Sequence, residues 1–114
     1  MNIKRGEIYL ANLDPVVGRE ISKTRPVIIV SNDKNNEFAG TVTILPITSK
    51  NLQKIYPFEL FLLKGAGNLP KDSKVKADQI RTLDKSRLVT RIGKLEKGEV
   101  SQIERAIRIH LELL

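Results

Sequence analysis

The spacing of short β-type runs between turn-forming residues constrains the fold of this chain most. Runs rich in β-branched and aromatic residues, each bounded by Gly, Pro, Asn or Asp, are typical of strands. Such runs cover residues 7–13, 26–31, 41–48 and 57–63. The weaker pattern over 73–83 predicts one or two further short strands, and that over 87–95 fits either another strand or an irregular crossing. Polar segments at 18–24, 32–40 and 49–56, and the glycine-rich segment 65–70, are expected to be loops.

The C-terminal segment has a different period. From residue 96 to residue 114 the apolar positions recur at helical spacing, which predicts one amphipathic helix. The stripe comprises Val100, Ile103, Ile107, Leu111 and Leu114, widened by Ala106 and by His110, which we expect to be packed or half-buried. Short strands closed by a single helix predict a mainly β fold, a small antiparallel barrel with the helix against one side. At 114 residues, we expect one domain over residues 1–114.

Charge and composition narrow the class of partner. The chain has 20 Lys and Arg against 13 Asp and Glu, a formal net charge of +7, which favours a polyanionic partner such as nucleic acid. It has no cysteine, so disulfides and thiol chemistry are excluded. Neither a signal-peptide core nor an apolar run approaching the roughly 20 residues of a membrane span is present, so we expect no membrane association and a cytoplasmic location.

The residue types with catalytic potential are few. There is one histidine, and no group of residues has the spacing of metal ligands, so a metal-dependent nuclease is disfavoured and we expect neither a metal site nor a cofactor. Gly65 and Gly67 precede Pro70 rather than a helix start, so they do not form a phosphate-binding loop. Basic residues are dense between 74 and 94 and near Arg25, which predicts a phosphate-contacting face, although a merely solvated surface fits the charge equally well.

Several motifs, in order along the chain, resemble the MazF/PemK family of toxin endoribonucleases. They are GEIY at 6–9, DPVVGRE at 14–20, KTRPVIIVSN at 23–32, PITS at 46–49, YPFE at 56–59 and DQIRTLD at 78–84. The resemblance implies an SH3-like barrel of the type shared by the MazF, Kid and CcdB toxins. It also implies a homodimer, cleavage of single-stranded RNA such as mRNA, and a cognate antitoxin as partner.

Arg25 and Thr48 are the candidate catalytic pair. Metal-free RNA cleavage requires neutralisation of the charge that develops on the phosphorus-centred transition state. The guanidinium of Arg25 stays charged and offers a planar fork of donors to phosphate oxygens, and the Thr48 hydroxyl can donate beside it. The resemblance also implies this pair, since the family's catalytic Arg and Thr occupy these motif positions.

Glu20, at the family's G-x-E position, is our candidate general base or substrate orienter. The alternative is a loop carboxylate paired with Lys23. Asp78 and Gln79 match the family's D-Q stretch and are candidates for reading base edges, which single-stranded RNA exposes. The alternatives are that Asp78 only balances Lys76, and that Gln79 only caps a strand.

Further hydroxyl and basic side chains near these motifs are expected to bind RNA. They are Arg19, Lys23, Thr24, Ser49, Lys50, Lys76 and Arg81. Some relatives carry an Arg two residues before the motif aspartate, and this chain has Lys76 at that position. This difference argues against a catalytic Asp-Arg arrangement at the site. Two other functions stay open: a non-catalytic nucleic-acid-binding barrel, which has no need of Arg25 with Thr48, and a gyrase-poisoning toxin, which is disfavoured because the chain has no Trp.

Overall fold

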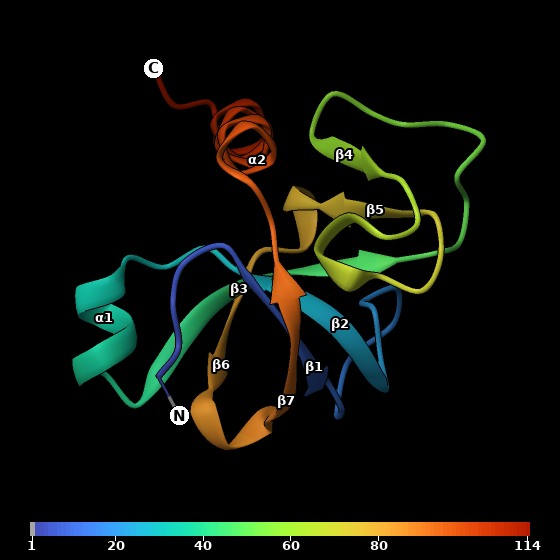
Figure 1. Cartoon of the computed structure of the whole chain (residues 1–114). Coiled ribbons are helices and arrows are strands. Elements are labelled where there is room, and N and C mark those ends of the chain that lie inside the picture. Colours follow the sequence, from blue (N-terminus) through green and yellow to red (C-terminus); the bar gives the residue numbers. More distant parts are fainter. Residues whose placement is uncertain (1) are drawn as a thin grey trace.

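The computed structural model describes residues 2–114 and confirms a mainly β fold with a C-terminal helix (Figure 1). The strands are β1 (Glu7–Asn12), β2 (Thr24–Ile29), β3 (Thr41–Thr48), β4 (Glu59–Leu62), β5 (Ser73–Lys76), β6 (Arg81–Asp84) and β7 (Leu88–Lys94). The helices are α1 (Asp33–Phe38) and α2 (Lys97–Leu111), with single 3₁₀ turns η1 (Ala66–Asn68), η2 (Ala77–Gln79) and η3 (Lys85–Arg87). The weak pattern over residues 73–83 is thus two strands separated by η2.

All strand pairs are antiparallel, and β3 lies at the centre of the sheet. The order is β4-β5-β3-β2-β1-β7, with β6 paired to β3 outside this path. The first half of β3 pairs with β6, whereas its last two residues, Ile47 and Thr48, pair with β5. Over residues 2–114 the ladder does not join β4 to β7, so the sheet curls like a barrel without closing.

Strand β1 is buried on both faces. Ile8 belongs to a helix-side cluster with Leu45, Ile103 and others, which lies between the sheet and α2. Tyr9, the next residue, belongs to an inner cluster on the opposite face, formed with Val27, Leu83 and others. Successive side chains of a strand point to opposite faces, so one strand contributes to both cores.

Helix α2 is shorter than predicted, and its last turn is exposed. A reciprocal capping box between Glu96 and Glu99 starts it, and Glu112, with a left-handed backbone (φ 56°), ends it after Leu111. The prediction of a packed or half-buried His110 is wrong. Full burial of the apolar stripe stops at Ala106, and Ile107 is half-buried. Beyond Ile107 the side chain of His110 is exposed and meets the ring of Phe58, with centroids 6.1 Å apart.

The segment 32–40, predicted to be a loop, contains helix α1. Asn32 starts the helix, because its side-chain oxygen accepts a hydrogen bond from the backbone N–H of Asn35 at 2.8 Å. Asn36 is buried, and its side chain donates to the carbonyl oxygen of Ser31. Residues that favour turns therefore act here as a helix cap and a buried polar anchor.

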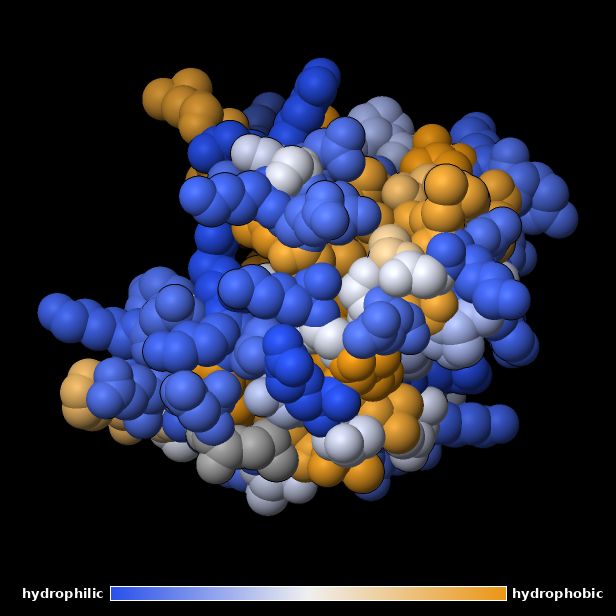
Figure 2. Space-filling model, viewed as in Figure 1, coloured by the Kyte–Doolittle hydropathy of each residue, from blue (hydrophilic) through white to orange (hydrophobic). Residues whose placement is uncertain are grey.

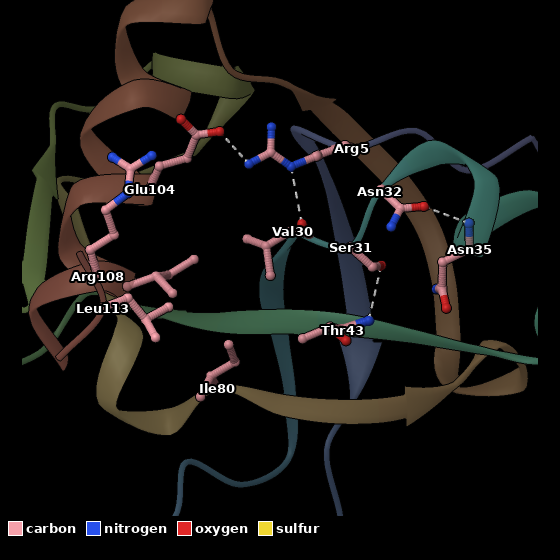
Figure 3. Close-up of a pocket in the computed structure, with 11 residues that line it drawn as sticks. Arg5, Val30, Ser31, Asn32, Asn35, Thr43, Ile80, Glu104, Arg108 and Leu113 are labelled. Carbon is pink, nitrogen blue, oxygen red and sulfur yellow. Dashed lines mark hydrogen bonds and ion pairs between the residues drawn. The ribbon is translucent and has the colours of Figure 1, made fainter. Parts of the chain in front are cut away.

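Arg5 ties the N-terminal segment to β2 and α2 (Figure 3). Its Nε donates to the carbonyl oxygen of Val30 at 3.1 Å, and its terminal nitrogen lies 2.5 Å from a carboxylate oxygen of Glu104. These residues line a cavity of about 560 Å³ between α1, the end of β2, β3 and α2. This cavity shares no lining residue with the candidate active site described below.

The face of the molecule seen in Figure 2 is mostly hydrophilic, with hydrophobic residues gathered over the region of β4 and again toward the lower right of the view. Phe61 of β4 and Leu63 just after it are exposed, whereas Phe58, before β4, is half-buried and stacks on Tyr56 with ring centroids 5.3 Å apart. Of the helices in residues 2–114, none has the length and apolar character that crossing a membrane requires.

Candidate active site

A cavity of about 290 Å³ gathers most of the predicted site residues. We call it the cationic cavity, and it lies where the β1–β2 loop meets the end of β3, β5 and η2. Its lining residues are Arg19, Glu20, Ile21, Ser22, Arg25, Thr48, Lys50, Asn51, Lys74, Lys76 and Gln79. The lining thus has several Lys and Arg side chains and only one carboxylate, that of Glu20. This excess of positive charge attracts a phosphate group.

Arg25 is held at the start of a strand with its terminal nitrogens available. It pairs with Ala11 in the β1–β2 ladder, and its Nε donates to the carbonyl oxygen of Ser22 at 3.2 Å. Within residues 2–114, neither terminal nitrogen of Arg25 has a hydrogen bond or an ion pair. The strand therefore fixes the guanidinium plane while its two outer NH₂ groups stay open to a ligand.

Thr48 is the last residue of β3, half-buried beside Arg25 in the same cavity. Its Oγ accepts a hydrogen bond from the backbone N–H of Lys50 at 3.2 Å. One of the two lone pairs of this hydroxyl is thus used locally, and its proton remains available to donate to a phosphate oxygen.

Glu20 lies in a tight turn of the β1–β2 loop. Its Oε1 accepts from the backbone N–H of Val17 at 2.6 Å, while its own N–H donates to the carbonyl oxygen of Val17 at 3.3 Å. No ion pair joins Glu20 to Lys23 among the described residues. The second carboxylate oxygen is left to face the cavity or a substrate.

Two lysines that line the cationic cavity, Lys74 and Lys76, share the buried carboxylate of Glu59, and we call these three residues the lysine clamp. The Oε1 of Glu59 lies 3.1 Å from Nζ of Lys74, and its Oε2 lies 2.9 Å from Nζ of Lys76. Burial raises the pKa of the Glu59 carboxyl, but hydrogen bonds from the Tyr56 N–H and from both lysines outweigh it, so the net pKa is below its ordinary value. Sequence reasoning assigned no role to Glu59, although it lies within the YPFE motif.

Gln79 and Arg81 hold the β1–β2 loop. The side-chain oxygen of Gln79 accepts from the backbone N–H of Ile21 at 2.8 Å, and Arg81 donates to the carbonyl oxygen of Leu13 at 3.3 Å. Arg87, one of the basic residues between 74 and 94 for which the sequence predicts phosphate contacts, donates to the carbonyl oxygens of Asn12 and Asp14. Gln79 lines the cationic cavity, whereas Arg81 does not.

The remaining predicted residues lie outside the cationic cavity. Asp78 is 3.9 Å from Nζ of Lys76, and its buried Oδ1 has no hydrogen-bond partner. Lys23 and Thr24 are exposed at the end of the β1–β2 loop, where the Lys23 N–H donates to Asp14. Ser49 lines a neighbouring cavity that also contains Arg25. Residues 2–114 contain no group of three or more His, Asp or Glu side chains that could hold a metal ion.

The fold and this cavity define a small basic protein of mainly β fold with a cationic cavity, and comparison with known proteins gives its family. The model of PemK-like, MazF-like toxins of type II toxin–antitoxin systems matches residues 4–111. The chain is 39% identical over 116 residues to the endoribonuclease MazF9 of Mycobacterium tuberculosis, a match that covers 97% of this chain and 98% of that protein. The chain therefore belongs to the PemK-like, MazF-like toxin family.

Solved structures share the fold over almost the whole chain. MazF from Deinococcus radiodurans matches with a TM-score of 0.84 and 25% identity, covering 99% of both chains. An endoribonuclease from Mycobacterial species, solved in complex with its cognate antitoxin, matches with a TM-score of 0.77 and 23% identity, covering 99% of this chain and 96% of that one. At 23% identity, the likeness to this complex shows a shared fold and no more.

Proposed function

We propose that this toxin is an endoribonuclease that cleaves single-stranded RNA, such as mRNA, at preferred sequences and without a metal ion or cofactor. The observation that carries the proposal is the convergence of Arg25 and Thr48, with free donors on both, in one cationic cavity. The identity to a protein named as an endoribonuclease supports the same activity.

In the proposed reaction the ribose 2′-oxygen attacks the adjacent phosphorus. The new O2′–P bond forms as the P–O5′ bond breaks, which leaves a 2′,3′-cyclic phosphate (or a 3′-phosphate after hydrolysis) and a 5′-hydroxyl end. The free oxygen of Glu20 takes the 2′-proton, and the departing 5′-oxygen takes up a proton from a water molecule. Arg25 and Thr48 donate to the nonbridging oxygens, where negative charge grows in the transition state.

The other cavity residues are assigned to RNA binding. Arg19, Lys50 and Lys76 neutralise backbone phosphates, and the Gln79 amide, whose oxygen is bound to Ile21, offers its NH₂ group to a base. Ser49, Lys23 and Thr24 lie beside the cavity and extend the path of the RNA backbone, and the Asp78 carboxylate accepts hydrogen bonds from base edges. Arg81 acts through the β1–β2 loop that it holds.

We further propose an assembly for this activity. Residues 1–114 form one toxin domain that acts in the cytoplasm as a homodimer. Its cognate antitoxin carries an acidic and apolar segment that covers the cationic cavity and excludes RNA. The solved complex of an endoribonuclease with its antitoxin supports such a partner for this fold.

The test incubates the purified protein with a long, weakly structured RNA in EDTA and maps the fragment ends. We expect discrete cuts with 5′-hydroxyl ends, lost in Arg25→Ala and Thr48→Ala. Arg105→Ala is the matched control, because Arg105 is an exposed arginine of α2 outside the cationic cavity. RNA that stays intact but bound would instead favour the non-catalytic barrel. Light scattering tests the dimer, and a monomer at working concentration contradicts it.

A further inference from the structure

A second, smaller cavity of about 170 Å³ adjoins the cationic cavity. Both cavities are lined by Arg25 and Thr48, so the proposed catalytic pair forms the wall between them. We call the smaller one the apolar cavity. Its other lining residues are Pro26, Ile47, Ser49, Leu69, Pro70, Lys71 and Ser73.

The lining of the apolar cavity suits a planar ring with a polar edge. Pro26 and Pro70 offer flat apolar rings and the lining includes the buried Ile47 and Leu69, whereas the lining of the cationic cavity is polar or charged apart from Ile21. The Ser73 hydroxyl donates to the carbonyl oxygen of Lys71 at 2.8 Å, so it faces a ligand as a hydrogen-bond acceptor. The exposed Lys71 brings a positive charge to the rim.

The β4–β5 segment, which supplies Leu69, Pro70 and Lys71 to one wall of the apolar cavity, is fixed before any ligand arrives. Leu69 is only 2% exposed and packs in the helix-side cluster. The Lys64 N–H donates to Asp72 at 2.8 Å, and the Asn68 side chain donates to the carbonyl oxygen of Ile92 at 3.1 Å. Gly93 passes so close that an added Cβ would lie 2.3 Å from the oxygen of Gly67. A rigid wall lowers the ordering cost of binding.

We infer that the apolar cavity is a subsite for one nucleobase of the RNA strand, that of a nucleotide flanking the scissile phosphate. This inference rests on the proposed function. With the phosphate at Arg25 and Thr48, the strand must leave in two directions, and the two cavities lie on either side of that pair. The base packs between Pro70 and Pro26 and donates an N–H to Ser73, while Lys71 neutralises the next phosphate.

The test is a double-mutant cycle between protein and RNA. Short RNAs containing the mapped cut site carry an abasic ribose at each flanking position in turn, and single-turnover kcat/KM is measured. We expect one abasic position to lower kcat/KM about tenfold in the parent protein. The double variant Pro70→Ala/Lys71→Ala alters two exposed rim residues. In this variant kcat/KM should be nearly the same for the abasic and the intact RNA, because the base has already lost its contacts.

Lys64→Ala is the matched control, because Lys64 is an exposed lysine of the same β4–β5 segment that does not line the apolar cavity. It should keep the full abasic penalty. Equal abasic penalties in parent and double variant at every position, with cutting retained, would overturn the subsite alone. A parent protein that cuts no RNA would overturn the proposed function and the subsite together.

Discussion

The ammonium of Lys74 lies 3.1 Å from Oε1 of Glu59, and the two side chains are only 4% and 0% exposed. The same ammonium donates to the carbonyl oxygens of Asn51 at 2.9 Å and Lys54 at 3.2 Å. These contacts fasten the β3–β4 segment over β5, and that segment carries Lys50 and Asn51 into the cationic cavity. The lysine clamp therefore joins stability of the fold to the shape of the site.

Removing one partner of this buried pair should destabilise the protein strongly. We expect Lys74→Met to lower the free energy of unfolding by about 3 kcal/mol, because Glu59 loses its most buried cation. Urea unfolding measures the change. Replacing Glu59 by Leu in the same chain should recover most of the loss, since no unpaired charge then stays buried. Equal losses in the single and double variants would contradict this account.

Stability should fall in acid through Glu59. Its pKa in the folded protein lies below the ordinary value of 4.5, so the unfolded chain takes up the proton first as the pH falls. The stabilisation is complete above about pH 4.5 and is lost as the pH drops through the folded pKa. Urea unfolding at a series of pH values should show a shallower acid decline for Glu59→Gln than for the parent.

The Thr48 hydroxyl should matter to the reaction more than to the fold. We expect Thr48→Val, which keeps the shape, to lower kcat about 100-fold, as removal of a donor to a transition-state oxygen does elsewhere. Thr48→Ser should retain most of the activity, since the donor remains. Single-turnover cleavage measures both variants, and equal activity of Val and Ser variants would remove Thr48 from the mechanism.

Arg81 and Lys50 should differ in the salt dependence of RNA binding. Lys50→Ala should reduce the slope of log K against log salt by about 0.7, the value for one phosphate on a single strand. Arg81→Met should leave that slope unchanged, because its guanidinium binds the carbonyl oxygen of Leu13. Anisotropy with a non-cleavable RNA measures the slopes, and hydrogen exchange over residues 13–23 should rise in Arg81→Met. Equal slope changes would make Arg81 a phosphate contact.

Local patterns predicted the strands well, because alternation and turn residues act within a few positions. The exposed last turn of α2 was missed, since the sequence does not show where the covering sheet ends. His110 continues the apolar stripe but has only Phe58 beside it. Helix α1 was missed because Asn32 and Asp33 are residues that also favour turns. The hydrogen bond from the Asn35 N–H to the Asn32 side chain, which caps the helix, is visible only in the structure.

Within the site, sequence motifs pointed to Arg25 and Thr48 and to the loop-holding Gln79 and Arg81, but not to Glu59, which holds Lys74 and Lys76. The structure brings Arg25 and Thr48 into one cavity, as predicted. Glu59, however, becomes informative only when β4 and β5 pair and place it against Lys74 and Lys76. Long-range pairings of this kind carry no signature in a single sequence.

The position of Ile8 and Tyr9 in opposite cores bears on how the protein unfolds. Because neighbouring residues of β1 support the helix-side and the inner clusters, neither cluster can melt while that strand stays in place. Helix α2 packs on the helix-side cluster, and β2, β3 and β6 surround the inner cluster. The loss of either group of contacts therefore weakens the other. We therefore expect the two clusters to unfold together, so that no partly unfolded form of the toxin keeps the cationic cavity intact.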